Sequence, residues 1–204
     1  AKRRLASSIT DFEQVKKDYQ TISLDRGPKG VLESIAIDQP VRAPLFYLID
    51  YFWVKQLNLE AGTARVIPAL FSTLQLPATY WLGLELFQAT PAALLATVFM
   101  ALSPIQLFYG QELREYPQLV FMILLSSAQL LKAHRTDELK DWLIYSILLC
   151  AGFYTSYLMS VVAIAHFVYA TYKEQAKFRR ETPKLSRLYL YYLATCVLAV
   201  LFFT

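Results

Sequence analysis

The sequence has few of the residues that build metal centres and catalytic sites in soluble enzymes. Only two cysteines, Cys150 and Cys196, and two histidines, His134 and His166, occur in 204 residues. Both cysteines lie in apolar runs, and their spacing indicates no disulfide framework, CxxC pair or metal site. We interpret both histidines as structural. Phosphate-binding loops, dinucleotide-binding fingerprints, zinc-protease motifs and nucleophile elbows are absent from the sequence, and so are recognisable nucleic-acid-binding modules.

Charged residues are scarce as well. They make up 18% of the chain, and hydrophobic residues make up 56%, whereas an average soluble domain has about 25% charged residues. The charges crowd into residues 1–65 and a few short loops, which leaves long uncharged runs between them. This pattern predicts an all-α polytopic membrane protein with a polar N-terminal region.

Six runs are candidate membrane spans, because a helix of about 20 apolar residues crosses the hydrocarbon core. They are approximately 66–87, 90–110, 116–132, 138–154, 157–173 and 188–204. The fourth and fifth come from one run, 142–172, that has no formal charge. We divide it near Tyr154–Tyr157, because one helix of that length would overshoot the core at about 1.5 Å per residue. A single long tilted helix is the alternative.

The distribution of lysine and arginine orients these spans. Segment 173–187 carries six basic and two acidic residues, and the positive-inside rule places it in the cytoplasm. With the long run divided, segment 132–141 falls on the same side, whereas 110–115 and 1–65 face outward. We therefore expect a multi-pass protein of the plasma (inner) membrane, with spans in 66–204 and an extracytoplasmic loop in 1–65.

The extracytoplasmic loop is expected to carry juxtamembrane helices. In the stretch 38–57, Pro40 and Pro44 set a rigid entry, and Asp50 and Lys55 interrupt the apolar face that follows. These features favour a helix at the membrane surface over a spanning one; a packing helix without a chemical role is the alternative. The exported polar region has no leader, and the last apolar run has no polar flank. We therefore expect a fragment that lacks a first span and further C-terminal spans.

The stretch SPIQLFYGQELREYPQLVF, residues 103–121, places charged residues between two apolar runs. Ser103-Pro104 interrupts a span and frees backbone groups that need partners, and Tyr109 and Tyr116 bracket the charges at headgroup level. Arg114 lies between two carboxylates, and its planar guanidinium suits phosphate oxygens. These features indicate a binding site for a lipid with a phosphate head. An ordinary solvated loop is the alternative.

The carboxylates of this stretch have several chemical uses. A carboxylate beside Arg114 can bind a divalent ion, orient a sugar hydroxyl or simply hold the guanidinium. If the helix that follows begins early, Glu112 shares one face with Glu115 and with Tyr116, at spacings of three and four residues.

Three stretches resemble the membrane glycosyltransferases of family 39. They read DQPVRAPLFYLIDYFW, RVIPALFSTLQLPATYWLGLELF and SPIQLFYGQELREYPQLVFMILLSSAQLLKAHR, and the resemblance covers most of residues 20–170. It implies the C-type glycosyltransferase fold, a helical bundle shared with the protein O-mannosyltransferases and the aminoarabinose transferase of lipid A. It also implies sugar transfer, outside the cell, from a polyprenyl-phosphate donor in the bilayer to an unidentified acceptor.

The resemblance also implies which residues form the site. In the family's second loop, where glutamate and arginine are expected to line the donor-phosphate and acceptor site, this chain has Tyr109, Gln111, Glu112, Arg114 and Tyr116. Among these, Glu112 is the catalytic candidate and a candidate ligand for a divalent metal, Mg or Mn. The general-base aspartate is expected upstream of residue 1.

The family's proline-rich loop carries over less well. It usually reads His-Pro-Pro-Leu-Tyr-Tyr, and this chain reads Arg42-Ala43-Pro44-Leu45-Phe46-Tyr47. Arg42 and Tyr47 remain candidate contacts to the donor, but arginine cannot serve as a neutral base near pH 7.

Two other functions stay open. A transporter or flippase of lipid-linked substrate predicts charged residues at mid-span and paired repeats, and the sequence shows neither pattern. A catalytically degenerate membrane scaffold is favoured by Arg42 and Ala43 and by the absence of the aspartate from this chain.

Overall fold

The computed structural model describes residues 44–57 and 65–178, and the described residues are helical without a strand. The helices are α3 (Leu45–Leu57), α4 (Val66–Phe87), α5 (Thr90–Ala101), α6 (Pro104–Gln111), α7 (Tyr116–Thr136), α8 (Leu139–Thr155) and α9 (Met159–Phe178). The prediction of an all-α bundle is confirmed for this part of the chain. Arg42, the run 188–204 and most of the N-terminal loop lie outside the described residues.

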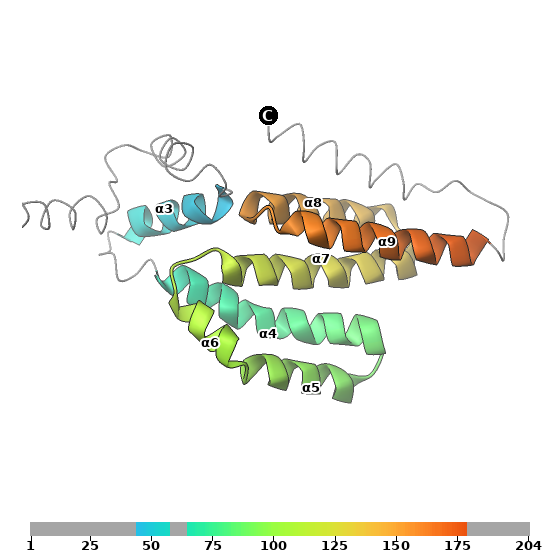
Figure 1. The fold of residues 1–204 in the computed structure, drawn as a ribbon, viewed down its shortest axis with the longest axis horizontal. Helices are drawn as coiled ribbons and strands as arrows, with labels where there is room; N and C mark the ends of the chain where they lie inside the picture. Colours follow the sequence, from blue (N-terminus) through green and yellow to red (C-terminus); the bar gives the residue numbers. More distant parts are fainter. Residues whose placement is uncertain (1–43, 58–64, 179–204) are drawn as a thin grey trace, which may run out of the picture.

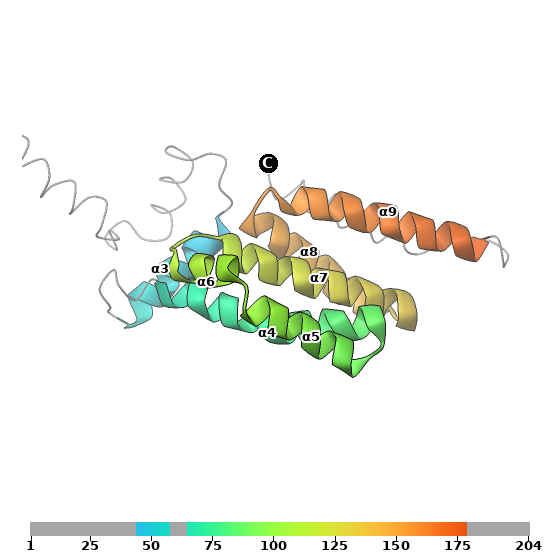
Figure 2. The ribbon, with the colours of Figure 1, turned by 60° about the horizontal axis from the view of Figure 1, so that its bottom comes forward.

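Helix α7 lies at the centre of the bundle. It contacts α4 on one side and α8 and α9 on the other, and both Figure 1 and Figure 2 show this order. Helices α5 and α6 pack on α4, and α3 packs against α8. The α6–α7 and α8–α9 connections lie at one end of the bundle, and the α4–α5 and α7–α8 connections lie at the other (Figure 1).

Particular residues begin and end these helices. Helices α5, α6 and α7 each have a proline in the first turn, where its missing N–H costs no hydrogen bond. Helices α4 and α7 end at Gln88 and Asp137, whose φ values of 52° and 53° are left-handed. The N–H of each donates to a carbonyl four residues back, to Leu84 and Ala133 respectively. This arrangement closes a helix end and turns the chain.

The run 142–172 forms two helices, and the break between them lies close to Tyr154–Tyr157. Helix α8 ends at Thr155, Ser156 is extended, and α9 begins at Met159. Gly152 makes this tight turn compatible with packing, because a Cβ there would lie 2.8 Å from the Met159 side chain. Met159 is fully buried, so the turn is itself part of the hydrophobic core.

The run 90–110 is broken at Ser103-Pro104, where the sequence indicated an interruption. It forms two helices, α5 and α6, bent by 55° at the break before Pro104. The break follows from proline chemistry, because the Pro104 ring cannot donate a hydrogen bond and clashes with the preceding turn. By length and composition, none of the described helices alone qualifies as a membrane span, whereas α5 and α6 taken together do.

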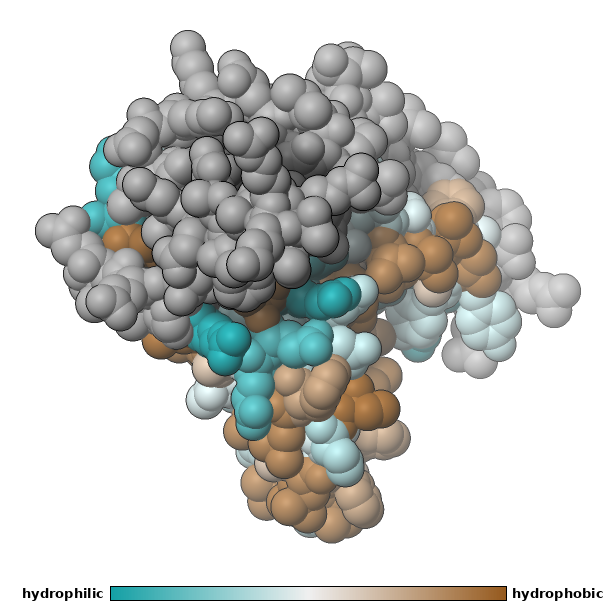
Figure 3. All heavy atoms as spheres, turned by 60° about the vertical axis from the view of Figure 1, so that its left-hand side comes forward, coloured by the Kyte–Doolittle hydropathy of each residue, from teal (hydrophilic) through white to brown (hydrophobic). Residues whose placement is uncertain are grey.

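The outer faces of several helices are hydrophobic. Large apolar side chains are exposed on several helices, among them Leu94, Leu95, Val98 and Phe99 on α5, Ile105, Leu107 and Phe108 on α6, and Val161, Ile164 and Val168 on α9. Figure 3 views the molecule from the side of the α6–α7 connection and shows a hydrophobic projection below a band of hydrophilic residues. An apolar surface of this extent needs a nonaqueous neighbour.

Candidate functional site

The α6–α7 connection, here called the hairpin and comprising residues 110–115, folds Arg114 back onto Glu112. Glu112 is extended, and the Arg114 N–H donates to the Glu112 carbonyl oxygen over 2.9 Å. This turn brings the side chains together, with 3.3 Å between Arg114 Nε and Glu112 Oε2. The Arg114 side chain is 50% exposed. The turn therefore presents an oriented guanidinium with donors still open to solvent.

Two tyrosines join the helices that carry the hairpin. The rings of Tyr109, on α6, and Tyr116, at the start of α7, meet edge to face with their centroids 5.0 Å apart. A hydrogen bond to the Tyr116 side chain, followed by the charge of Glu112, raises the pKa of Arg114 above its ordinary value. The guanidinium thus stays protonated at any physiological pH, as anion binding requires.

The start of α7 settles how Glu112 and Glu115 are arranged, which the sequence left open. Helix α7 begins at Tyr116 and does not extend back to Glu112, so Glu112 shares no helical face with Glu115 or Tyr116. The reason is Pro117, which cannot donate to the Leu113 carbonyl and would clash with it in a longer helix. Glu112 instead contacts the arginine two residues later.

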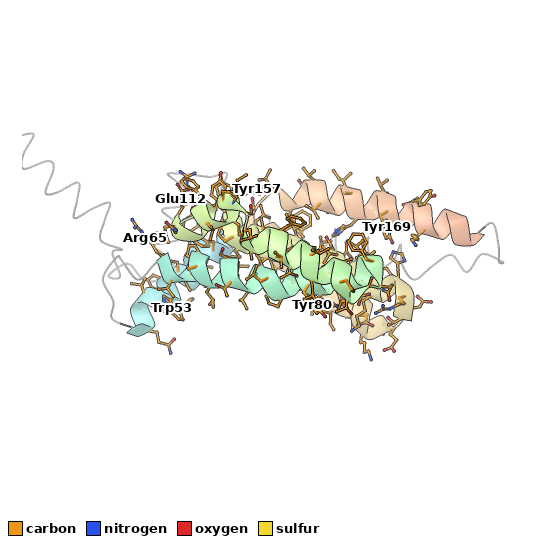
Figure 4. All side chains as sticks on the ribbon, turned by 90° about the horizontal axis from the view of Figure 1, so that it is seen from below. Trp53, Arg65, Tyr80, Glu112, Tyr157 and Tyr169 are labelled. Atoms are coloured by element: carbon orange, nitrogen blue, oxygen red, sulfur yellow. The ribbon has the colours of Figure 1, made fainter. Side chains whose placement is uncertain are left out.

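The other predicted site residues lie apart from this group. Gln111 is the last residue of α6 and is exposed. Tyr47 lies on α3 with its ring against Phe46, at a centroid distance of 5.4 Å. Figure 4 shows Glu112 at the same end of the bundle as Trp53 of α3. The structure thus assembles Tyr109, Glu112, Arg114 and Tyr116, and Arg42 lies outside the described residues.

The described residues do not form an evident metal-binding site. No group of three or more histidine, cysteine, aspartate or glutamate residues there is arranged to hold one. Glu112 contacts Arg114, and a guanidinium competes with a cation for the same carboxylate oxygens. A divalent metal at Glu112 therefore stays a prediction, and no chemical step below depends on it.

The sequence did not single out the polar contacts that hold the hairpin to α4. Gln106 Nε2 donates to the Ser72 hydroxyl over 3.0 Å and to the Ser72 carbonyl over 3.3 Å. Gln75 Nε2 donates to the Pro117 carbonyl over 2.7 Å. A glutamine in the middle of the apolar stretch VIPALFSTLQLPATYW was the available signal, because a buried amide is costly unless it is bonded.

Helix α3 buries polar atoms that have no hydrogen-bond partner among the described residues. They are Asp50 Oδ1, Tyr51 Oη and Trp53 Nε1. Asp50 is only 6% exposed, and burial raises its pKa to about 6. Figure 1 shows the Leu45 end of α3 beside the turn from α8 to α9, and α3 contacts α8. Asp50 is therefore an unusual carboxyl group near the same end as the hairpin.

Comparisons with known proteins agree with the resemblance seen in the sequence. The profile of the dolichyl-phosphate-mannose-protein mannosyltransferase family matches residues 42–203, which is more than half of the chain. No curated protein and no solved structure gives a significant match. The matched region contains the hairpin and every described helix. The chain belongs to the dolichyl-phosphate-mannose-protein mannosyltransferase family.

Proposed function

We propose that the protein is a membrane glycosyltransferase that moves a sugar from a polyprenyl-phosphate donor to an acceptor hydroxyl on the extracytoplasmic face. Family membership supports glycosyl transfer in general. The observation that carries the finer proposal is the geometry of Arg114. Its guanidinium is half-exposed, lies 3.3 Å from Glu112 and is flanked by the Tyr109–Tyr116 ring pair. A planar donor held in this way suits the oxygens of a phosphate group.

The distribution of apolar and charged residues supports a membrane setting. Exposed hydrophobic side chains on α5, α6 and α9 suit lipid tails. The end of the bundle opposite the hairpin carries Lys132, Arg135 and Lys140, and a cytoplasmic face is rich in basic residues. The hairpin then lies at the outer headgroup level, where the phosphate of a lipid-linked sugar lies.

The proposed reaction is a single displacement with inversion. The acceptor oxygen bonds to the anomeric carbon while the bond from that carbon to the phosphate oxygen breaks. The electron pair leaves with the polyprenyl phosphate, and Arg114 stabilises the charge that develops there. Glu112 orients the guanidinium. The acceptor proton passes to a general base, which the resemblance implies is a carboxylate.

The proposal is tested with Arg114→Ala in the full-length protein, reconstituted in lipid and supplied with dolichyl-phosphate mannose and a hydroxyl-bearing acceptor. Loss of one such electrostatic contact lowers a transfer rate by about a hundredfold or more, and that is the expected result. The matched control is Arg135→Ala. Arg135 is also half-exposed and ion-paired, 2.9 Å from Glu85, but lies at the opposite end of the bundle. Equal transfer rates in the two variants would contradict the proposal.

The two remaining functions give different results in the same vesicles. A flippase would move the donor lipid between leaflets without breaking its sugar–phosphate bond. A degenerate scaffold would neither move nor cleave it. Either outcome would replace the transferase assignment, so the assay follows both the leaflet and the chemical state of the lipid.

A further inference from the structure

One face of α4 holds both arms of the hairpin. Ser72 and Gln75 are three residues apart on α4, so they lie one above the other on the same face. Ser72 binds Gln106 on α6, and Gln75 binds the Pro117 carbonyl in the first turn of α7. Helix α4 therefore makes hydrogen bonds with the chain on both sides of Arg114, with α6 before it and α7 after it.

The α6 arm lies close against α4. A Cβ added at Gly110 would lie 2.8 Å from the Ser72 hydroxyl oxygen, so only glycine fits without a shift. Gly110 is buried and immediately precedes Gln111 at the end of α6. The contact between α6 and Ser72 thus leaves little freedom for the position at which the hairpin begins.

The α7 arm is held from two sides. Gln75 and Gln118 are both fully buried. Gln75 reaches the Pro117 carbonyl from α4, and Gln118 Nε2 donates to the Thr155 hydroxyl on α8 over 3.1 Å. Burying an amide in an apolar bundle costs free energy that leucine at the same position would not. The two amides therefore indicate that the start of α7 is held by specific hydrogen bonds, which apolar packing alone would not provide.

We propose that Gln75 is a positioning residue for the donor-phosphate site. Its hydrogen bond to the Pro117 carbonyl fixes the start of α7 relative to α6. The position of α7 relative to α6 in turn sets where the Tyr116 ring meets Tyr109 and where the Arg114 guanidinium lies beside Glu112. The inference rests on the proposed function, because it gives Gln75 a role through Arg114 and not through contact with the lipid.

The first test compares Gln75→Leu with Gln129→Leu in the full chain. Gln129 is also a buried glutamine, and its Nε2 donates to the Asp141 carbonyl over 2.9 Å, but at the opposite end of the bundle. Gln75→Leu loses one buried hydrogen bond, whereas Gln129→Leu loses two contacts to Asp141, to its carbonyl and to its carboxylate. The control is therefore expected to be at least as destabilised as Gln75→Leu. We expect Gln75→Leu alone to weaken dolichyl phosphate binding, by about tenfold, the effect of one typical buried hydrogen bond. Equal dissociation constants for the two variants would overturn the inference.

The second test uses Gln75→Glu to restore the hydrogen bond by protonation. A neutral carboxylic acid donates to the Pro117 carbonyl, whereas an ionised carboxylate repels it. Burial raises the pKa of a glutamic acid above its usual value of about 4.3. Relative to the unsubstituted protein at the same pH, Gln75→Glu should bind dolichyl phosphate well near pH 5 and worse near pH 8. A variant as weak as Gln75→Leu at pH 5 would count against the inference.

Arg114→Ala separates this inference from the proposed function. If Arg114→Ala leaves dolichyl phosphate binding unchanged, the donor-phosphate site itself is wrong, and the role of Gln75 is wrong with it. If Arg114→Ala weakens binding and Gln75→Leu does not, only the positioning role is wrong. We expect Gln75→Leu to add little in an Arg114→Ala background, because residues that act through one another are not additive.

Discussion

Arg114 and Glu112 are joined twice within three residues, once through the backbone and once through their side chains. The Arg114 N–H donates to the Glu112 carbonyl over 2.9 Å, and Arg114 Nε lies 3.3 Å from Glu112 Oε2. The backbone contact fixes the direction of the turn, and the side-chain contact fixes the plane of the guanidinium. Together they orient a cation at the end of an apolar bundle before any ligand arrives.

The first prediction concerns Glu112. Glutamine at this position keeps an oxygen that accepts from Arg114 Nε, whereas alanine does not. We therefore expect dolichyl phosphate binding to change by less than about threefold in Glu112→Gln and to weaken by about tenfold in Glu112→Ala. Dissociation constants measured in lipid nanodiscs check this. Equal weakening in both variants would show that the charge of Glu112, and not its orienting contact, determines affinity.

The second prediction concerns Asp50 and pH. Burial raises its pKa from 3.8 to about 6 in the folded protein, so the folded state holds this proton more tightly than the unfolded state does. Its contribution to stability is complete below about pH 4 and is lost as the pH rises through 6. Asp50→Asn should therefore raise the unfolding temperature at pH 7.5 and leave it nearly unchanged at pH 4. The size of the effect at pH 7.5 is about 2–3 kcal/mol.

Unfolding temperatures of both proteins in detergent at the two pH values check the Asp50 prediction. A lower unfolding temperature of Asp50→Asn at pH 7.5 would mean that the ionised carboxylate has a favourable partner. In that case Asp50 Oδ1, which has no hydrogen-bond partner among the described residues, would have one in solution.

The third prediction compares two glycines. A Cβ at Gly83 would lie 2.8 Å from the Ala93 Cα on α5, and a Cβ at Gly110 would lie 2.8 Å from the Ser72 hydroxyl oxygen. Either alanine substitution forces helices apart and should destabilise the fold by about 1–3 kcal/mol. Only Gly110→Ala should also weaken dolichyl phosphate binding, because Gly83 is at the other end of α4. Weaker binding in both variants would show that binding follows overall stability.

The fourth prediction concerns Asp141. Its carboxylate is buried, with Lys132 Nζ at 3.1 Å and the Thr136 hydroxyl at 2.7 Å. Asp141→Ala leaves the Thr136 hydroxyl and the buried Gln129 amide without their carboxylate partner, and each buried group left unbonded costs about 1–3 kcal/mol. The Lys132 side chain is 36% exposed, so water solvates its ammonium. We expect a large drop in unfolding temperature without weaker dolichyl phosphate binding in the folded fraction. An unchanged unfolding temperature would show that Thr136 and Gln129 find other partners.

Local sequence signals predicted several elements well. The bounds of α4 match the predicted run 66–87, because Arg65 precedes an apolar run whose one charged residue, Glu85, lies near its end. The turn between α8 and α9 was found at Tyr154–Tyr157, since the length of the run required a break. The bracketing of the hairpin by Tyr109 and Tyr116 was predicted, and the two rings are in contact.

Features that depend on distant parts of the chain were not predicted. The hydrogen bond from Gln75 to Pro117 joins residues 42 apart, and no local pattern reveals its partner. Whether Glu112 shares a helical face with Glu115 was left open by the sequence, and the structure excludes it because α7 begins at Tyr116, one residue before Pro117. The 55° bend between α5 and α6 depends on the packing of α6 against α4, through Ser72 and Gln106, as well as on Pro104.

The most direct test of the central claim is the phosphorus NMR signal of dolichyl phosphate in nanodiscs that contain the protein. If Arg114 binds the phosphate, the signal shifts and broadens with the unsubstituted protein and with Arg135→Ala, and returns to its free position with Arg114→Ala. The same shift in Arg114→Ala as in the unsubstituted protein would contradict the account, because the hairpin would then not be the place where the donor phosphate binds.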